Sequence, residues 1–86
     1  MLNSHYQIKK RRWSELAFDY SKLKGKMVEV YGSQTAFASA FGVSENTFSK
    51  KMNNKVRFTS DDIIKISSML KIPKDEVGTY FFTIKV

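Results

Sequence analysis

Between positions 20 and 31, apolar residues recur at the spacing of one helical face. These residues are Tyr20, Leu23, Met27, Val30 and Tyr31. Asp19 or Ser21 can cap the start of such a helix, and Gly32 can end it because glycine readily adopts a left-handed conformation. The pattern therefore predicts a first helix that ends at Gly32 and turns these apolar side chains toward a core.

A second, shorter helix is predicted from Ser33, which can cap it, to Gly42, which ends it after about two turns. Its apolar stripe consists of Ala36, Phe37, Ala40 and Phe41. Ala38 is small at a point where a neighbouring helix must approach closely, and Gly42 can take the left-handed conformation of a tight turn. The next helix should therefore follow almost at once.

That third helix is indicated by Ser44, a good N-cap, and by Val43, which can pack against Phe48 across the first turn. Met52 continues the apolar face of Phe48 one turn later. Two short helices joined by a tight turn containing glycine, the second opened by a serine cap, are typical of a helix-turn-helix. We place this motif at about residues 33–53.

The same capping pattern recurs at Phe58 and Thr59, where Thr59 caps a fourth helix and Ile63 can pack on Phe58. Asp61 and Asp62 fall in the first turn, where the helix dipole favours negative charge. The inner stripe of this helix is formed by Ile63, Ile66, Ser67 and Leu70. The pattern thus predicts a helix that begins near residue 60.

Pro73 suits the start of a short fifth helix through about Val77, which Gly78 would close. Beyond it, apolar Tyr80, Phe82, Ile84 and Val86 alternate with Phe81, Thr83 and Lys85, the period of a strand. A lone strand has unpaired edges, so a partner must bond them. We favour the same strand of a second subunit across a two-fold axis, and hence a homodimer; the alternative is an extended piece of the same chain.

Residues 1–17 lack sustained periodicity and contain a basic cluster, which indicates a tail beside a domain of residues 18–86. The cluster is Lys9, Lys10, Arg11 and Arg12. It is either a solvated run or a phosphate contact. A third interpretation is a translated leader, because an Arg-Arg pair can be read from a purine-rich ribosome-binding sequence and leucine from the start codon TTG. The natural chain would then begin near Leu16.

Composition narrows the class of protein. With 86 residues and 42% hydrophobic content, the chain suffices for one compact domain, and its formal charge of +7 favours a polyanionic partner, either nucleic acid or an acidic membrane surface. Cysteine is absent, so neither disulfides nor thiolate metal ligands hold the fold. No apolar run approaches a membrane span and no signal peptide is evident, which indicates a soluble cytoplasmic protein without a membrane partner.

Catalysis is disfavoured. The one histidine, His5, lies in the tail, and the sequence contains no metal-ligand spacing or phosphate-binding loop. The carboxylates of Asp61 and Asp62 are better explained as a helix N-terminus than as a catalytic pair. We expect neither an enzyme nor a cofactor, metal or small-molecule ligand.

The outward face of the third helix, about residues 45–53, is polar, short-chained and mostly uncharged, as base reading in the major groove requires. Asparagine can pair with adenine and lysine can reach guanine, while helix N-terminal amides can meet phosphates. Lys55 and Arg57 could hold the DNA backbone, whereas Glu45 is repelled by phosphates unless it accepts from a cytosine amine. The predicted DNA-binding residues are Ser33, Gln34, Thr35, Ser44, Glu45, Asn46, Thr47, Ser49, Lys50, Asn53, Lys55 and Arg57.

Five stretches stand in the order and spacing of a known family. They are Phe-Asp-Tyr-Ser-Lys-Leu (18–23), Gly-Ser-Gln-Thr-Ala-Phe-Ala (32–38), Gly-Val-Ser-Glu-Asn-Thr-Phe-Ser (42–49), Asn-Asn-Lys-Val (53–56) and Tyr-Phe-Phe-Thr-Ile-Lys (80–85). By them the chain resembles the small Cro-like repressors of phages. The resemblance implies a lambda-repressor-like bundle of about five helices with a short C-terminal strand, and transcriptional control in a phage or prophage.

By the same resemblance, the side chains that face DNA are Gln34, Ser44, Asn46, Thr47, Ser49 and Lys50. Lys51 departs from the pattern, since related proteins commonly have an apolar residue there. We therefore expect either a rotated recognition helix or a core that relies on Met52.

The sequence thus predicts a sequence-specific regulator that binds a double-stranded DNA operator with inverted half-sites in the cytoplasm of a bacterial host. A protein-interaction module of the same fold is the main alternative, binding another regulator through its C-terminal strand. DNA binding predicts an affinity that falls steeply with salt, and the alternative predicts salt-insensitive partner binding. Membrane-surface binding through the basic tail is a third interpretation.

Overall fold

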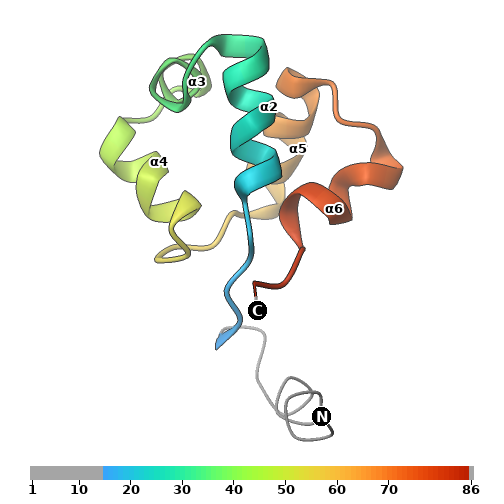
Figure 1. The fold of residues 1–86 in the computed structure, drawn as a ribbon. Coiled ribbons are helices and arrows are strands. Elements are labelled where there is room, and N and C mark those ends of the chain that lie inside the picture. The colour runs from blue at the N-terminus through green and yellow to red at the C-terminus, as the bar shows by residue number, and fades with distance from the viewer. Residues whose placement is uncertain (1–14, 86) are drawn as a thin grey trace, which may run out of the picture.

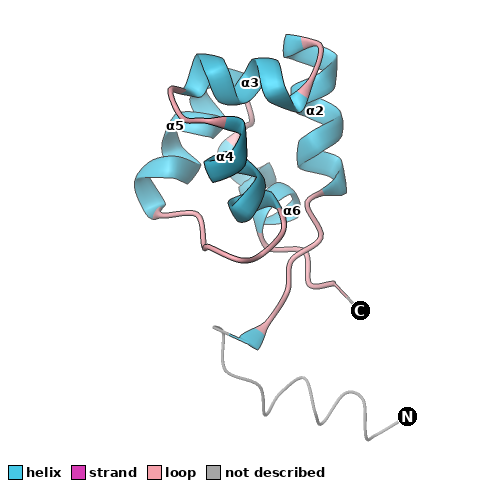
Figure 2. Ribbon diagram, turned by 90° about the vertical axis from the view of Figure 1, so that its left-hand side faces the viewer, coloured by secondary structure: helices cyan, strands magenta, loops and turns pink. Residues whose placement is uncertain are grey.

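The computed structural model describes residues 15–85, which Figure 1 shows as a bundle of short helices. The α-helices are α2 (Ser21–Tyr31), α3 (Gln34–Phe41), α4 (Glu45–Met52), α5 (Ser60–Leu70) and α6 (Val77–Phe81), and the 3-10 helix η2 (Lys74–Glu76) leads into α6. Helix α2 packs against α3, α5 and α6, and α3 packs against α4. Figure 2 shows that the regular structure of the described part is helical. The mainly helical fold class is therefore confirmed.

The core is one continuous cluster of apolar side chains to which all five α-helices contribute. A row of aromatic rings runs through it from Phe37 to Phe48, Phe58 and Phe81, with centroid separations of 5.6, 5.9 and 5.7 Å. Tilted and edge-to-face pairs at such spacing stabilise a core beyond the apolar area they bury. The row connects α3 to α6 through α4 and the loop before α5, so α4 is held from its buried side.

Helices α3, α4 and α5 begin as their capping residues predict. The expectation for α2 was wrong, because its N-cap is Tyr20, which makes no side-chain capping bond, and not Asp19 or Ser21. Ser33 Oγ accepts a hydrogen bond from Ala36 N at 2.9 Å, and Ser44 Oγ accepts one from Thr47 N at 3.1 Å. Thr59 and Asp62 form a reciprocal capping box at the start of α5. Gly42 has a φ of +103°, so the left-handed turn expected there is confirmed.

Two of the predicted stripes were partly wrong. Val30 is 49% exposed, although it stands at helical spacing with the buried residues of α2. Helical spacing alone does not reveal how far along α2 the neighbouring elements extend. In α3, Ala36 and Ala40 are exposed while Ala38 is buried. The buried face of α3 is therefore rotated toward Ala38, since a small side chain lets α4 approach closely.

The predicted C-terminal elements need correction. Gly78 does not end a helix but lies inside α6, and Tyr80 and Phe81 are neighbours that are both buried. A strand with one buried face would expose one of these two side chains, whereas the helix brings both against the core. Within residues 15–85, strand pairing is limited to an isolated antiparallel bridge between Phe18 and Ile84.

This bridge gives one edge of the C-terminal segment a partner within the same chain. Asp19 N donates to Thr83 O at 2.8 Å, and Lys85 N donates to Ala17 O at 2.8 Å. The extended piece of the same chain, the less favoured alternative, thus bonds one edge of the C-terminal segment. The two segments lie side by side at the lower end of the molecule in Figure 1.

Leu16 was assigned to the tail but is buried in the core. A non-helical segment that packs with a few side chains leaves no periodic signal, so its sequence looked like that of a tail. The basic cluster of residues 9–12 and the proposed leader up to residue 14 lie outside the described residues, as does Val86.

Candidate functional site

The turn between α3 and α4 sets the orientation of α4. Gly42 N and Val43 N both donate to Ala38 O, at 3.0 and 3.2 Å, which closes the C-terminal end of α3. Ser44, three residues beyond the last residue of α3, caps the start of α4. The Phe48 side chain of α4 is fully buried. Because Phe48 points inward, the opposite side of α4 is directed to solvent.

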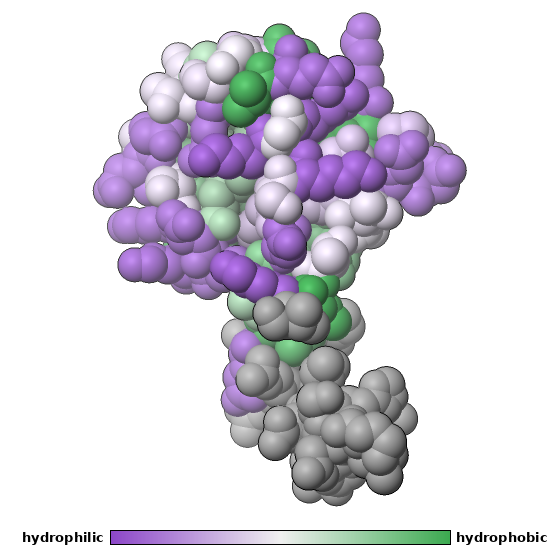
Figure 3. All heavy atoms as spheres, viewed as in Figure 1, coloured by the Kyte–Doolittle hydropathy of each residue, from purple (hydrophilic) through white to green (hydrophobic). Residues whose placement is uncertain are grey.

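We call the outward side of this helix the α4 face, defined by Asn46, Thr47, Lys50 and Asn53, all of which are exposed. Hydrophilic side chains cover the part of the molecule formed by α4, on the left in Figures 1 and 3. Thr35, Ser44, Glu45 and Lys55 are exposed as well, whereas Ser33, Gln34 and Ser49 are half-buried. The predicted outward direction of these side chains is therefore what the structure has.

Several of these side chains bond to each other. Gln34 Nε2 donates to Glu45 Oε2 at 3.4 Å, which connects the starts of α3 and α4. Asn53 Nδ2 donates to Ser49 Oγ at 3.1 Å. Asn46 and Lys50 make no side-chain hydrogen bond or ion pair to any described residue, so both are available to a ligand.

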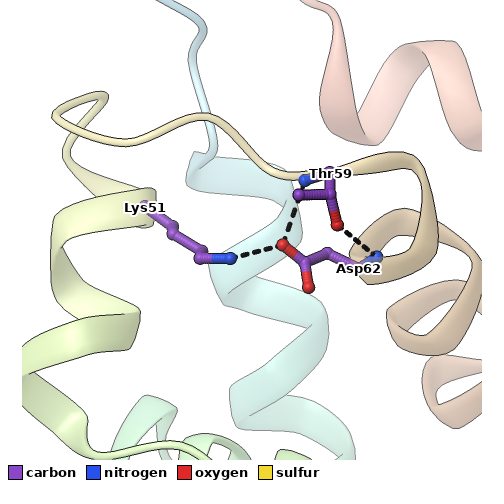
Figure 4. Close-up of polar contacts among 3 residues, drawn as sticks. All are labelled: Lys51, Thr59 and Asp62. Carbon is purple, nitrogen blue, oxygen red and sulfur yellow. Dashed lines mark hydrogen bonds and ion pairs between the residues drawn. The ribbon is translucent and has the colours of Figure 1, made fainter.

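An ion pair accounts for the lysine at position 51, where an apolar residue was expected. Its Nζ reaches from α4 to the Asp62 carboxylate, which also accepts from Thr59 N at 3.0 Å (Figure 4). Burial alone would raise the pKa of Asp62, but the hydrogen bond and charge of Lys51 together with the Thr59 bonds hold it below its usual value. The helix is not rotated: Phe48 stays inward, and the ion pair covers its flank.

Arg57, predicted to hold DNA phosphates, instead contacts the N-terminal segment. It is half-buried, its Nη2 donates to Leu16 O, and its guanidinium carbon lies 4.9 Å from the centroid of the Phe18 ring. These contacts attach Arg57 to the N-terminal segment. A sequence cannot reveal this, because the contacts join residues about forty positions apart.

Asn54 is a residue that the sequence prediction missed. Its φ of +64° is left-handed, and its side chain bonds both backbone polar groups of Phe18. The signal in the sequence was the residue type, because asparagine is one of the few residues that tolerate a left-handed conformation.

An open groove of about 490 Å³ lies between α4 and the first turn of α2. Its polar lining includes Lys24, Gln34, Glu45, Ser49, Asn53 and Lys85. Both signs of charge are therefore present beside the α4 face. Within residues 15–85, no group of three or more histidine, cysteine or acidic side chains could hold a metal ion, and no helix is long and apolar enough to cross a membrane.

The chain is similar to known proteins over most of its length. Residues 16–84 match the family described as "Protein of unknown function (DUF739)". The chain belongs to this family. A comparison with curated proteins returned no match.

Among solved structures, the chain is similar to the solution structure of the modulator of repression (MOR) of the temperate bacteriophage TP901-1 from Lactococcus lactis. The identity is 43%, the TM-score is 0.70, and the match covers 76% of this chain and 88% of that protein. The resemblance to phage regulatory proteins is thus supported, whereas membership of the Cro-like repressors is not shown, because the relative is described as a modulator of repression. The described residues of the α4 face fall within the family match.

Proposed function

We propose that this chain is a phage regulatory protein that modulates repression by binding another regulatory protein, namely a repressor, in the bacterial cytoplasm. The observation that carries the proposal is its 43% identity to a modulator of repression across 88% of that protein. Homologues that share this much sequence and a TM-score of 0.70 commonly keep their type of partner. This was the alternative interpretation of the sequence, with a different surface.

The contact surface in this proposal is the α4 face with the adjoining groove. The C-terminal strand that the sequence suggested for partner binding is instead a short segment bonded to residues 17–19. The α4 face offers uncharged donors and acceptors in Asn46, Thr47 and Asn53, and one available cation in Lys50. Such a polar surface can form hydrogen bonds across a protein–protein interface, which carries about ten direct hydrogen bonds on average.

The distribution of charge argues against DNA as the main partner. Near the α4 face, Lys51 is paired with Asp62 and Arg57 is bound to the N-terminal segment. Lys50 and Lys55 remain exposed, as do Lys24 and Lys85 in the adjoining groove, and the Glu45 carboxylate lies at the start of α4. Four phosphate contacts predict a salt slope of about −3.6, below the value of about −10 for a repressor that binds its operator with many contacts.

The experiment measures binding to two probes in parallel: the purified repressor encoded beside this chain's gene, and the DNA that flanks that gene. We expect repressor binding that changes little between about 50 and 200 mM salt, and no footprint on the DNA. Lys50→Ala and Asn46→Ala should each weaken repressor binding at least about fivefold. Lys74→Ala, which removes an exposed lysine from η2, is the matched control and should leave binding unchanged.

A footprint on the flanking DNA without repressor binding would contradict the proposal. It would favour the second candidate function, direct DNA reading by a helix-turn-helix formed by α3 and α4. That candidate rests on the serine caps at both helix starts and on the exposure of Asn46 and Lys50. In that case Lys50→Ala should cost about 1–3 kcal/mol on the best site and relax the preference at one base pair.

A further inference from the structure

The N-terminal and C-terminal segments form a short antiparallel pair that uses only one edge of residues 17–19. Ala17 O and Asp19 N bond to residues 85 and 83. Because successive residues of an extended chain direct their polar groups to opposite edges, the N–H and C=O of Phe18 point away from this pair. That second edge requires its own partner.

The side chain of Asn54 is that partner. Phe18 N donates to Asn54 Oδ1 at 2.8 Å, and Asn54 Nδ2 donates to Phe18 O at 2.9 Å. A side-chain amide offers the same donor and acceptor pair as a peptide group, so Asn54 takes the place of a neighbouring strand. Glutamine would carry this amide one methylene farther out, and aspartate would lack the donor.

Asn54 is also part of the turn that closes α4. Asn54 N donates to Lys51 O at 3.2 Å, and the next residue, Lys55, donates its N–H to Lys50 O at 2.8 Å. The left-handed φ of Asn54 directs the chain out of the helix at this point. One residue thus ends α4 with its backbone and holds the N-terminal segment with its side chain.

Arg57 reinforces the same contact. Its Nη1 donates to Asn54 Oδ1 at 3.2 Å, while its guanidinium also lies over the Phe18 ring and bonds Leu16 O. Phe18 is buried beneath it. The contact is therefore a built arrangement of hydrogen bonds and packing, and it lies next to the Asn53 end of the α4 face.

We propose that Asn54 is a positioning residue that couples the C-terminal end of α4 to the paired terminal segments, residues 16–19 and 82–85. When the Asn54 contact opens, both segments separate from the bundle together, and the Asn53 end of the α4 face loses its support. A partner bound to the α4 face consequently stabilises the terminal segments at a distance. This last consequence rests on the proposed function; the coupling itself does not.

The coupling is tested on the free full-length chain by amide hydrogen exchange in Asn54→Gly, which keeps the positive φ and removes the side chain. The informative amides are those of Asp19 and Lys85, because neither bonds to Asn54. We expect both to exchange about 30-fold faster than in the wild type, from the loss of the two hydrogen bonds between Asn54 and Phe18, while Gly42 N at the end of α3 changes little.

Lys71→Gly is the matched control. Lys71, like Asn54, is a non-glycine residue with positive φ, but it is exposed at the end of α5, and its replacement by glycine adds the same freedom to the unfolded chain. It should leave the Asp19 and Lys85 amides protected. Wild-type protection of these two amides in Asn54→Gly would overturn the proposal.

The linked part is tested by adding the repressor encoded beside this chain's gene. Binding should slow exchange at Asp19 and Lys85 in the wild type and not in Asn54→Gly, even at saturation. A purely stabilising residue would not produce this difference between the two proteins. Equal slowing in both would refute the coupling, whereas no binding to the wild type would refute the proposed function and leave the free-chain result standing.

Discussion

Replacing Lys51 by methionine tests how α4 is attached to α5. Both side chains of the Lys51–Asp62 pair are shielded, with 15% and 16% of their surfaces exposed, so the pair is more than a surface contact. Removing the lysine leaves the carboxylate with its bond from Thr59 N, while methionine restores apolar packing on that flank. We therefore expect the free energy of unfolding to fall by about 1–2 kcal/mol, between the values for exposed and fully buried pairs.

Urea and thermal denaturation of the full chain would measure this change. For a domain of this size, the melting temperature should fall by about 5–15 °C. Lys26→Met removes the lysine of an exposed pair with Glu29, 3.8 Å apart, and should change stability by less than about 0.5 kcal/mol. In an Asp62→Asn background, Lys51→Met should cost much less, because the two residues act together.

The same pair predicts a dependence on pH. The folded pKa of Asp62 lies below its ordinary value of 3.8, so its contribution to stability is complete above that value and is lost as the pH falls through the folded pKa. Lys51→Met removes part of the cause of the lowered pKa and should flatten the loss of stability below about pH 4. Unchanged stability at neutral pH together with an unchanged acid profile would refute this account of the pair.

Three further predictions concern the fold. Gly42→Ala should destabilise the domain by about 1 kcal/mol through its positive φ alone. Gly25→Ala, inside α2 and equally free of close neighbours, should instead stabilise it by about 0.5–1 kcal/mol. A change of the same sign in both unfolding experiments would be inconsistent with the left-handed turn at Gly42. Thr59→Ala should cost about 1 kcal/mol in urea denaturation by removing the capping box, and no loss would mean that Asp62 suffices. A chain ending at Phe81 should be less stable but sediment like the full chain, because residues 83–85 bond within the same molecule; a dimer of the full chain alone would restore the strand-dimer interpretation.

Local sequence signals were sufficient for the starts of α3, α4 and α5 and for the turn before α4. Ser33, Ser44 and Thr59 cap their helices with bonds to residues three positions ahead, and such bonds need no tertiary information. Gly42 and Ala38 were informative for the same reason, since backbone conformation and side-chain size act within one turn of chain. The outward direction of Asn46 and Lys50 then followed from helical geometry.

The family match and the similarity to a phage modulator of repression support the role in phage regulation that the resemblance implied. Helix pattern and net charge favoured DNA over a protein partner, whereas the similarity to a modulator of repression favours the protein partner. That choice depends on which cations remain available, and Lys51 and Arg57 are both engaged within the chain. Net charge counts these residues although their side chains are engaged within the chain.

Only the tertiary structure decided how the chain ends are arranged. The alternation from Tyr80 to Ile84 favours a strand, but burial of Tyr80 and Phe81 against the core favours α6, and packing outweighs a short periodic signal. The bonds of Asn54 to Phe18 join residues 36 positions apart in sequence, and no pattern within a window of ten or so residues contains them. Sequence alone determined where α2 to α5 form, because helical spacing and capping act locally. Which side chains remain free for a partner was decided by contacts that exist only once the distant segments have met.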